Sequence, residues 1–266
     1  MVKDEKPVFG TREWANHNVN CIAGCSHECL YCFAESDSVR YKRKTSDSWR
    51  NESVNRRKLE KGFRKRQGRF MFPTTHDITP EHLDECMLFL KNILKPGNEV
   101  LVVTKPHMEC IKSICDRFSE YRRQILFRFT IGSTDNDTLS FWEPHAPSFG
   151  ERLESLMYAF SSGYATSVSA EPMLDNNADD LIQQVRPYLT DAIWLGKGNR
   201  MISRLRANGH GDPETLRRAV HLMASLSAEY VLDLYGRYRD DPRIKWKDSL
   251  KKVVGIEISV KAGLDI

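Results

Sequence analysis

The sequence contains no apolar run long enough to span a bilayer, and its charged N-terminus lacks a signal-peptide pattern. We therefore expect no membrane partner. Three of the seven cysteines are close together, which is a poor arrangement for a disulfide scaffold and favours a reducing compartment, the cytoplasm. A chain of 266 residues can bury one substantial core. We expect a single domain over 1–266, with its core at about 15–200 and a helical and strand extension at 201–266.

Positive charge is concentrated in one segment. Residues 40–69 contain thirteen Lys/Arg and three Asp/Glu, a net charge of +10 in a chain whose net charge is +4. A basic segment on an otherwise acidic chain is typical of a polyanion-binding surface, so we expect nucleic acid as a partner through 40–69. The alternative is a solvated helix face. The aromatic residues of the segment, Tyr41, Trp49 and Phe63, are consistent with base stacking and equally with helix anchoring.

Three cysteines form a tight group near the N-terminus. Cys25, Cys29 and Cys32 have the spacing C-x3-C-x2-C, and Tyr31 precedes the last of them. A cubane [4Fe-4S] cluster can take four thiolates, so a loop that offers three leaves one iron open for a substrate or a cofactor. We therefore predict that these cysteines are iron ligands and that chemistry occurs at the open iron.

Two other metal sites compete with this interpretation. Zinc sites favour two C-x2-C pairs, and only Cys29 and Cys32 form such a pair. Cys21 would supply a fourth thiolate and give a plain electron carrier, but it falls in a predicted strand, where a thiol is usually a small buried hydrophobic group. The remaining cysteines lie in apolar helical patterns and are predicted core residues: Cys86, Cys110 and Cys115.

Beyond the cysteine loop, apolar strand-like runs alternate with amphipathic helical patterns. One predicted helix has Thr79 as its N-cap and Pro80 in its first turn. Another begins near Ser148 and carries an apolar stripe of Leu153, Leu156, Met157 and Phe160. The alternation predicts an α/β fold, a partial (β/α)6 TIM-like barrel with the cysteine loop after strand 1. Its six strands are predicted at 18–22, 69–72, 99–103, 125–131, 166–170 and 192–195.

Polar residues follow each predicted strand after the first. In barrels of this type the working residues lie at the carboxyl ends of the strands, so these positions are candidates for the site. Asp77 and Asp135 have an alternative role as helix caps. The candidates are Thr74, Thr75, His76 and Asp77; Thr104 and Lys105; Ser133, Thr134 and Asp135; Glu171; and Lys197 and Asn199.

Four motifs resemble the spore photoproduct lyase-like radical S-adenosylmethionine (SAM) proteins, a family related to DNA repair photolyases. They are Thr-Thr-His-Asp at 74–77, Val-Val-Thr-Lys-Pro at 102–106, the run 142–153 with Trp-Glu-Pro, Ala-Pro-Ser and Glu-Arg-Leu, and Ser-Val-Ser-Ala-Glu-Pro at 167–172. The cysteine spacing is similar to that of the wider radical SAM superfamily. The resemblance covers about 21–175.

This resemblance implies a lyase or modifying enzyme in which Cys25, Cys29 and Cys32 hold a [4Fe-4S] cluster and SAM chelates the open iron. A one-electron donor of the flavodoxin or ferredoxin type would reduce the cluster, and SAM would be cleaved to methionine and a 5′-deoxyadenosyl radical. By analogy, the SAM contacts are Tyr31 in the cysteine loop, Thr75 and Asp77 at the amino group, Lys105 at the carboxylate, and Ser133 with Glu171 at the ribose. A cation for a carboxylate and acceptors for an ammonium also make electrostatic sense.

Two features depart from the family. The Gly-Gly-Glu common after strand two in other radical SAM families is absent. In the lyase that the motifs resemble, a C-terminal cysteine is expected to return a hydrogen atom to the product. This chain has no cysteine after Cys115. We therefore do not expect direct repair of that thymine lesion. Tyr230, Tyr235 and Tyr238 are alternative hydrogen donors, although their apolar neighbours favour a packing helix.

The leading hypothesis is a radical SAM enzyme that repairs or modifies nucleic acid. The first alternative is the same chemistry on a peptide, protein or small metabolite, with 40–69 as a solvated cover over the cluster. The second is a non-catalytic iron-sulfur or zinc module.

Overall fold

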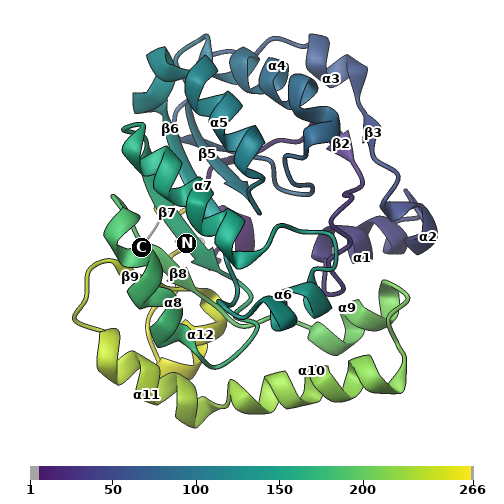
Figure 1. Ribbon diagram of the computed structural model, residues 1–266, viewed down its shortest axis with the longest axis vertical. Helices are drawn as coiled ribbons and strands as arrows, with labels where there is room; N and C mark the ends of the chain where they lie inside the picture. The colour runs from purple at the N-terminus through teal and green to yellow at the C-terminus, as the bar shows by residue number, and fades with distance from the viewer. Residues whose placement is uncertain (1–5, 265–266) are drawn as a thin grey trace, which may run out of the picture.

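The structure is a computed structural model, and it describes residues 6–264. Its main feature is a sheet of seven parallel strands in the order β1-β4-β5-β6-β7-β8-β9, with helices along one face (Figure 1). Each crossover places the next strand of the sheet beside the previous one, as in barrel folds. The strands are β1 (His17–Asn18), β4 (Arg69–Phe72), β5 (Glu99–Thr104), β6 (Ile125–Thr130), β7 (Ala165–Ala170), β8 (Ile193–Leu195) and β9 (Ile244–Trp246).

The predicted partial α/β barrel is confirmed, with one strand more than expected. Strands β4 to β8 coincide with five of the predicted strands to within one residue at each end. The prediction at 18–22 is too long, because β1 ends at Asn18 and Cys21 lies in the loop that follows. Strand β9 escaped prediction because its three residues, Ile-Lys-Trp, lie among charged residues and carry no apolar run.

Side chains alternate between the two faces of the sheet, as strand geometry requires. On β5, Val100 and Val102 belong to the larger apolar core, whereas Leu101 belongs to a smaller cluster on the opposite face. The larger core lies under four helices, visible along the sheet in Figure 1: α4 (Leu83–Leu94), α5 (Met108–Arg117), α7 (Phe149–Ser161) and α8 (Ala178–Val185).

Two tryptophans and a buried arginine fill the space on the opposite face of the sheet. The rings of Trp14 and Trp194 meet edge to face with their centroids 5.7 Å apart. The guanidinium carbon of Arg128 lies 4.9 Å from the Trp14 ring centroid and 5.3 Å from that of Trp194. Its charge is balanced by Asp191, which precedes β8, at 3.0 Å. The interior is therefore filled toward the amino ends of the strands and leaves their carboxyl ends for a site.

Both helices predicted in detail are present, as α4 and α7, but the start predicted for the first is wrong: Thr79 and Pro80 begin a short 3-10 helix, Pro80–His82, and α4 follows from Leu83. The hydroxyl of Ser148 accepts a hydrogen bond from the first turn of α7, as a cap does. The apolar stripe predicted for α7 is rotated: Leu156 is buried, but Met157 and Phe160 are exposed. The reason is Arg152, a fully buried charged residue that occupies the core-facing side of the helix.

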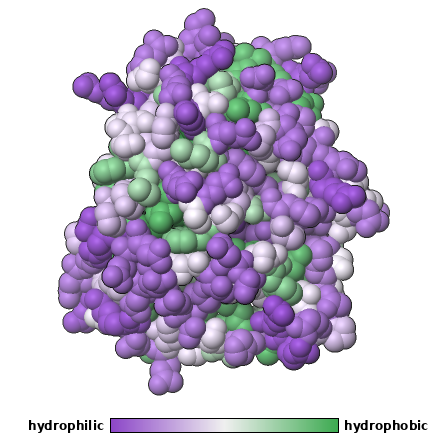
Figure 2. All heavy atoms as spheres, in the orientation of Figure 1, coloured by the Kyte–Doolittle hydropathy of each residue, from purple (hydrophilic) through white to green (hydrophobic). Residues whose placement is uncertain are grey.

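The segment between β1 and β4 forms a separate flap. It contains α1 (Phe33–Arg40), α2 (Ser46–Trp49) and α3 (Arg56–Glu60), and β2 (Ile22–Ala23) pairs antiparallel with β3 (Ser53–Val54). The basic segment 40–69 therefore begins beside the cysteine loop. It ends beneath the amino ends of the strands, where the backbone N–H of Arg66 donates to Oδ1 of Asn98, the residue before β5, at 2.9 Å. Hydrophilic residues cover most of the face seen in Figure 2.

The C-terminal extension adds the last strand of the sheet. It contains α9 (Met201–Ala207), α10 (Pro213–Ser225), α11 (Ala228–Tyr238), β9 and α12 (Asp248–Val254). Helices α10 and α11 run along one end of the molecule (Figure 1). Tyr230 and Tyr235 pack against the apolar core from α11, which agrees with the packing alternative. No helix within 6–264 combines the length and the apolar character needed to cross a bilayer.

The two ends of the described chain lie side by side. The backbone N–H of Val8 donates to the carbonyl of Ser259, and that of Gly263 to the carbonyl of Arg12, both at 2.9 Å. The N-terminal segment then runs through the interior past Trp14 before it enters β1. It thus bridges the gap between the two edge strands, β1 and β9.

Candidate active site

A cavity of about 420 Å³ opens at the carboxyl ends of the strands, as predicted for a barrel of this kind. It brings together residues from the cysteine loop and from the ends of five strands, β4 to β8. The predicted residues that line it are Cys25, Cys29, Tyr31, Cys32, Thr74, Thr75, His76, Asp77, Lys105, Glu171, Lys197 and Asn199.

The cysteine loop is shaped by backbone that only certain residues tolerate. Gly24 has a positive φ of 103°, and a Cβ there would approach the carbonyl oxygen of Trp49 to 2.5 Å. Glu28 also has a positive φ, 47°. The loop is anchored from outside by hydrogen bonds from the N–H of Cys25 to the carbonyl of Trp49, 3.2 Å, and from the N–H of Leu30 to the carbonyl of Trp142, 3.0 Å. The positive-φ residues and these hydrogen bonds therefore fix the loop in a conformation that turns its thiols toward the cavity.

The three thiols suit metal binding. Burial raises the pKa of Cys25 well above its usual value, and it raises that of Cys32 to about 11. Burial also raises the pKa of Cys29, against the charge of Lys105. These thiols therefore stay protonated unless a cation displaces the proton, and buried thiolates require such a partner. Three thiols with a cavity beside them fit an iron-sulfur cluster that has one open iron.

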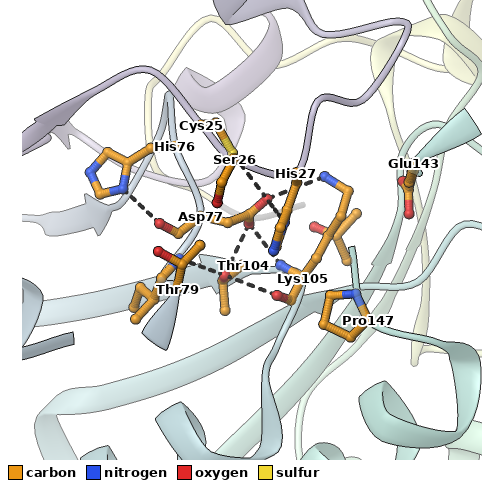
Figure 3. A network of polar contacts seen from close by, with 12 residues as sticks. Cys25, Ser26, His27, His76, Asp77, Thr79, Thr104, Lys105, Glu143 and Pro147 are labelled. Atoms are coloured by element: carbon orange, nitrogen blue, oxygen red, sulfur yellow. Dashed lines mark hydrogen bonds and ion pairs between the residues drawn. The ribbon is translucent and has the colours of Figure 1, made fainter. Parts of the chain in front are cut away.

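Asp77 is the centre of a polar network at the floor of the cavity (Figure 3). Its carboxylate accepts from Nδ1 of His27 at 2.9 Å, from the hydroxyl of Thr104 at 2.9 Å and from the backbone N–H of Lys105 at 2.8 Å. The Lys105 ammonium lies 3.5 Å away. Burial opposes its ionisation, yet Lys105 and His27 hold the pKa of Asp77 well below its usual value. Asp77 is thus an ionised group that orients the cysteine loop and Lys105, and it is not a helix cap.

His27 links this network to the surface. Its Nε2 lies 2.9 Å from Nε2 of His107, whose Nδ1 is 3.6 Å from Glu151 Oε1. The potential ligand atoms of Cys25, His27 and Asp77 all lie within 4.8 Å of one another, so His27 lies beside the candidate cysteine ligands. Its hydrogen bond to Asp77 helps to hold the loop in place.

Tyr31 belongs to a second buried network, which the sequence did not reveal. Its hydroxyl donates to Oε1 of Glu143, and Oε2 of Glu143 pairs with Nη2 of Arg152 at 2.6 Å. Both charged residues are wholly buried. Glu143 and Arg152 both come from the motif run 142–153, in its Trp-Glu-Pro and Glu-Arg-Leu parts, and their role is to fix the aromatic residue of the cysteine loop.

Ser133 does not reach the cavity. It is buried, its hydroxyl donates to the carboxylate of Asp175, and it accepts from the backbone N–H of Asp135 at 2.9 Å. Asp135 caps α6 (Asn136–Trp142), as the alternative interpretation expected. Ser169 of β7 lines the cavity instead, and its buried hydroxyl has no hydrogen-bond partner among the described residues. Ser169 lies in β7 and Glu171 directly follows that strand, and their separation of two residues puts both side chains on the cavity side.

Glu171 is held by a lysine that no motif predicted. Nζ of Lys247, directly after β9, lies 3.3 Å from Oε2 of Glu171, 2.7 Å from Oε1 of Glu13 and 2.9 Å from the carbonyl of Gly10. Lys247 is fully buried, and its ammonium lies 4.1 Å from the Trp14 ring centroid. Burial raises the pKa of Glu171 in spite of this cation. The N-terminal segment thus lines the cavity, and Lys247, next to β9, joins that segment to Glu171.

Cys21 lies apart from the three loop cysteines. It is buried in the main core beside Cys86 and His76, and it is not among the residues that line the cavity. Cys86, Cys110 and Cys115 are buried in α4 and α5, as predicted.

Comparisons with known proteins support the fold. No protein-family model matches the chain. An uncharacterised protein, ORF301, of Acidianus two-tailed virus is 25% identical over 176 residues, which cover 62% of this chain and 57% of that protein. A spore photoproduct lyase variant with bound SAM and dinucleoside spore photoproduct has a TM-score of 0.56 at 17% identity, covering 80% of this chain and 65% of that one.

SuiB of Streptococcus suis, in its structure bound to SAM, has a TM-score of 0.53 at 12% identity, covering 93% of this chain and 54% of that one. The chain thus spans between about half and two thirds of the length of these three proteins. It has the partial-barrel fold of radical SAM enzymes, which confirms at the level of the fold the resemblance predicted from the motifs.

Proposed function

We propose that this protein is a radical SAM enzyme that holds a [4Fe-4S] cluster through Cys25, Cys29 and Cys32 and binds SAM in the adjoining cavity. The observation that carries the proposal is the placement of three buried or half-buried thiols in the wall of a cavity whose other walls offer Lys105, Ser169 and Glu171. When bound, the reduced cluster supplies the electron that cleaves SAM to methionine and a 5′-deoxyadenosyl radical.

The cavity side chains match the polar groups of SAM. Lys105 would pair with the carboxylate while Asp77, its partner at 3.5 Å, keeps the ammonium aimed at the cavity. Thr75 and the Asp77 carboxylate, which also line the cavity, would accept hydrogen bonds from the amino group. The unpartnered Ser169 hydroxyl and the Glu171 carboxylate would bond the ribose hydroxyls, so Ser169 takes the role first expected of Ser133. Lys247 keeps Glu171 in place.

A direct assay tests this proposal. Anaerobically reconstituted protein is expected to contain about four irons per chain and to release 5′-deoxyadenosine when dithionite and SAM are added. Iron analysis and chromatography of the products are the measurements. Protein that takes up zinc in place of iron, or that holds iron but never cleaves SAM, would favour the non-catalytic module. In the cell a flavodoxin or ferredoxin would replace dithionite, and a reducing compartment such as the cytoplasm would keep the thiols free.

We further propose that the substrate is a nucleic acid. The support is a set of cations in the segment that contains the cavity-lining residues Phe33 and Trp49: Arg40 at the end of α1, which starts at Phe33, then Lys42 and Arg43, and Arg50 directly after Trp49. All four are exposed, and none forms an ion pair with a carboxylate within 6–264. Such unpaired cations near a site attract phosphates and release counterions when they bind them. The later cations of 40–69 lie toward the other end of the sheet, where the amino ends of the strands are.

This division gives the substrate proposal an internal control. If the four cations near the cavity contact duplex phosphates, log K should fall with log salt with a slope of about −3 to −4, and replacing them with Gln should flatten it almost fully. The control variant replaces four exposed cations of the distant part with Gln: Arg57, Lys61, Arg64 and Arg66. Fluorescence anisotropy with labelled DNA or RNA measures both variants, which lose equal charge.

Two results would count against a nucleic acid. One is the absence of binding at low salt. The other is an equal loss of affinity in the two variants, because non-specific attraction depends on net charge and not on the position of the cations. Either result would favour the alternative of a peptide, protein or small metabolite as the substrate.

A further inference from the structure

Arg204 is an unpartnered cation in the cavity wall. Its guanidinium forms no hydrogen bond or ion pair with any residue in 6–264, although the side chain is half-buried and lines the cavity. The other cations of the site have partners: Lys105 pairs with Asp77, Lys197 donates to the carbonyl of Leu226 at 3.3 Å, and Lys247 pairs with Glu171. A half-buried guanidinium without an acceptor is a costly arrangement that an anionic ligand would relieve.

The position of Arg204 is fixed by the cysteine loop. Helix α9 buries Met201 and Leu205 in the core. The residue after the helix, Asn208, is buried and donates its amide hydrogens to the carbonyls of Leu30, 3.1 Å, and Cys32, 2.9 Å. The hydroxyl of Ser46 donates to the carbonyl of Asn208 at 2.6 Å. These bonds hold α9 against the start of α1 and so place the Arg204 side chain at the cavity wall.

An exposed aromatic ring faces this cation. Phe33 directly follows Cys32, lines the cavity and is 40% exposed, and the guanidinium carbon of Arg204 lies 5.9 Å from its ring centroid. A second pairing of this kind lies at the end of that helix, where Arg40 and Arg43 lie 5.5 and 5.2 Å from the ring centroid of Tyr41, the residue directly after α1, which is 60% exposed. Residues 33 and 40 are seven apart, so they share one face of α1 about 10 Å apart.

We propose that Phe33 and Arg204 form a nucleotide clamp at the cavity, in which one base stacks on the Phe33 ring and its phosphate pairs with the Arg204 guanidinium. The inference rests on the proposed nucleic-acid function and deepens it, because it names the point where the strand enters the site. The cation–ring pairs around Tyr41 extend this nucleotide-binding surface outward along α1. Chemistry on a base requires that base to leave its stack, and an aromatic platform with a cation beside it is how single-stranded nucleic acid is held. The clamp is therefore specific for an unpaired nucleotide.

The test uses full-length reconstituted protein and a fluorescent single-stranded oligodeoxythymidylate. Arg204→Gln is expected to weaken oligonucleotide binding roughly ten- to hundredfold and to reduce the salt slope by about 0.7. Phe33→Leu is expected to weaken binding to a similar extent without changing the slope, because stacking carries no charge. Arg206→Gln is the matched control: the residue is exposed on the same helix and does not line the cavity, and its effect should be less than twofold. Iron content checks that each variant folds.

The guanidinium could also receive the carboxylate of SAM, so SAM affinity is measured on the same samples. A loss of SAM affinity in Arg204→Gln with unchanged oligonucleotide binding would overturn the clamp and assign the anion to the cofactor. Equal losses in Arg204→Gln and Arg206→Gln would also overturn it, since only general charge would then matter. If the unmodified protein binds no oligonucleotide at low salt, the nucleic-acid function itself fails. If it binds and neither Arg204→Gln nor Phe33→Leu weakens it, the clamp alone fails.

Discussion

Replacing any one of Cys25, Cys29 or Cys32 with alanine is expected to abolish iron retention and 5′-deoxyadenosine formation, whereas Cys21→Ala should leave both largely intact. The three loop thiols line one cavity, and two remaining thiolates cannot hold a cluster that needs three protein ligands. Cys21 is turned into the core beside Cys86, away from that cavity. Iron analysis, the visible absorption of the cluster and product chromatography measure the effect, which should be complete for the three loop variants.

The control for this experiment is Cys110→Ala. Cys110 is buried in α5, so the variant loses the same thiol from a packed environment without touching the loop. This variant should lose only folding stability, because a small buried hydrophobic group is removed. If Cys21→Ala destroys the cluster while Cys110→Ala does not, then Cys21 is a fourth ligand, no iron is open, and the proposal of SAM chemistry fails.

Arg152→Met is expected to lower the free energy of unfolding by about 3–5 kcal/mol, because it leaves the buried carboxylate of Glu143 without its counter-charge. Burial alone raises the pKa of Glu143, but Arg152 and Lys105, with a hydrogen bond from Tyr31, outweigh it and hold the pKa below its usual value. Without Arg152 that balance reverses and protonation is favoured. The loss of stability should therefore be smaller at pH 5 than at pH 8, where Glu143 must remain charged. Urea unfolding at the two pH values measures it.

The double variant with Glu143→Gln and Arg152→Met provides the control. It removes both charges, so it should recover a large part of the lost stability, as neutral replacements of buried pairs do. Tyr31 would still have an acceptor in the Gln amide oxygen. If the double variant is as unstable as the sum of the single ones, the two side chains act independently and the pair does not organise the cysteine loop.

The sequence predicts well what apolar periodicity and strand ends determine. Strands β4 to β8 are runs of apolar and β-branched residues, and the polar residues directly after β4 and β5 enter the cavity. It predicts less well where burial of a charge overrides periodicity. Arg152 occupies the core side of α7 and turns Met157 and Phe160 outward, because its partner Glu143 is buried opposite. No pattern of single residues predicts such a buried ion pair.

Other site residues were missed because tertiary structure alone brings them to the cavity. Ser169 lies inside a strand, two residues before the predicted Glu171, and inward alternation along β7 was the available signal. Lys247 and Arg204 belong to the C-terminal extension, where no motif marks them. Lys247 reaches the site because β9 pairs with β8, and Arg204 because Asn208 binds the cysteine loop. The count of charged residues located the basic segment. It could not show that the segment is divided between the two ends of the sheet.

The contact between Gly10 and Lys247 joins positions 237 residues apart in the chain. Ribosomes add about 5–20 residues per second, so the N-terminal segment waits many seconds for the lysine that fixes it. The cysteine loop is synthesised early, whereas Lys247, which pairs with Glu171 and binds Gly10, is synthesised only after β9. The contacts that hold Glu171 and the N-terminal segment together therefore form only once the chain has been made as far as Lys247. An iron-loading machinery that recognises the complete arrangement would act after that point.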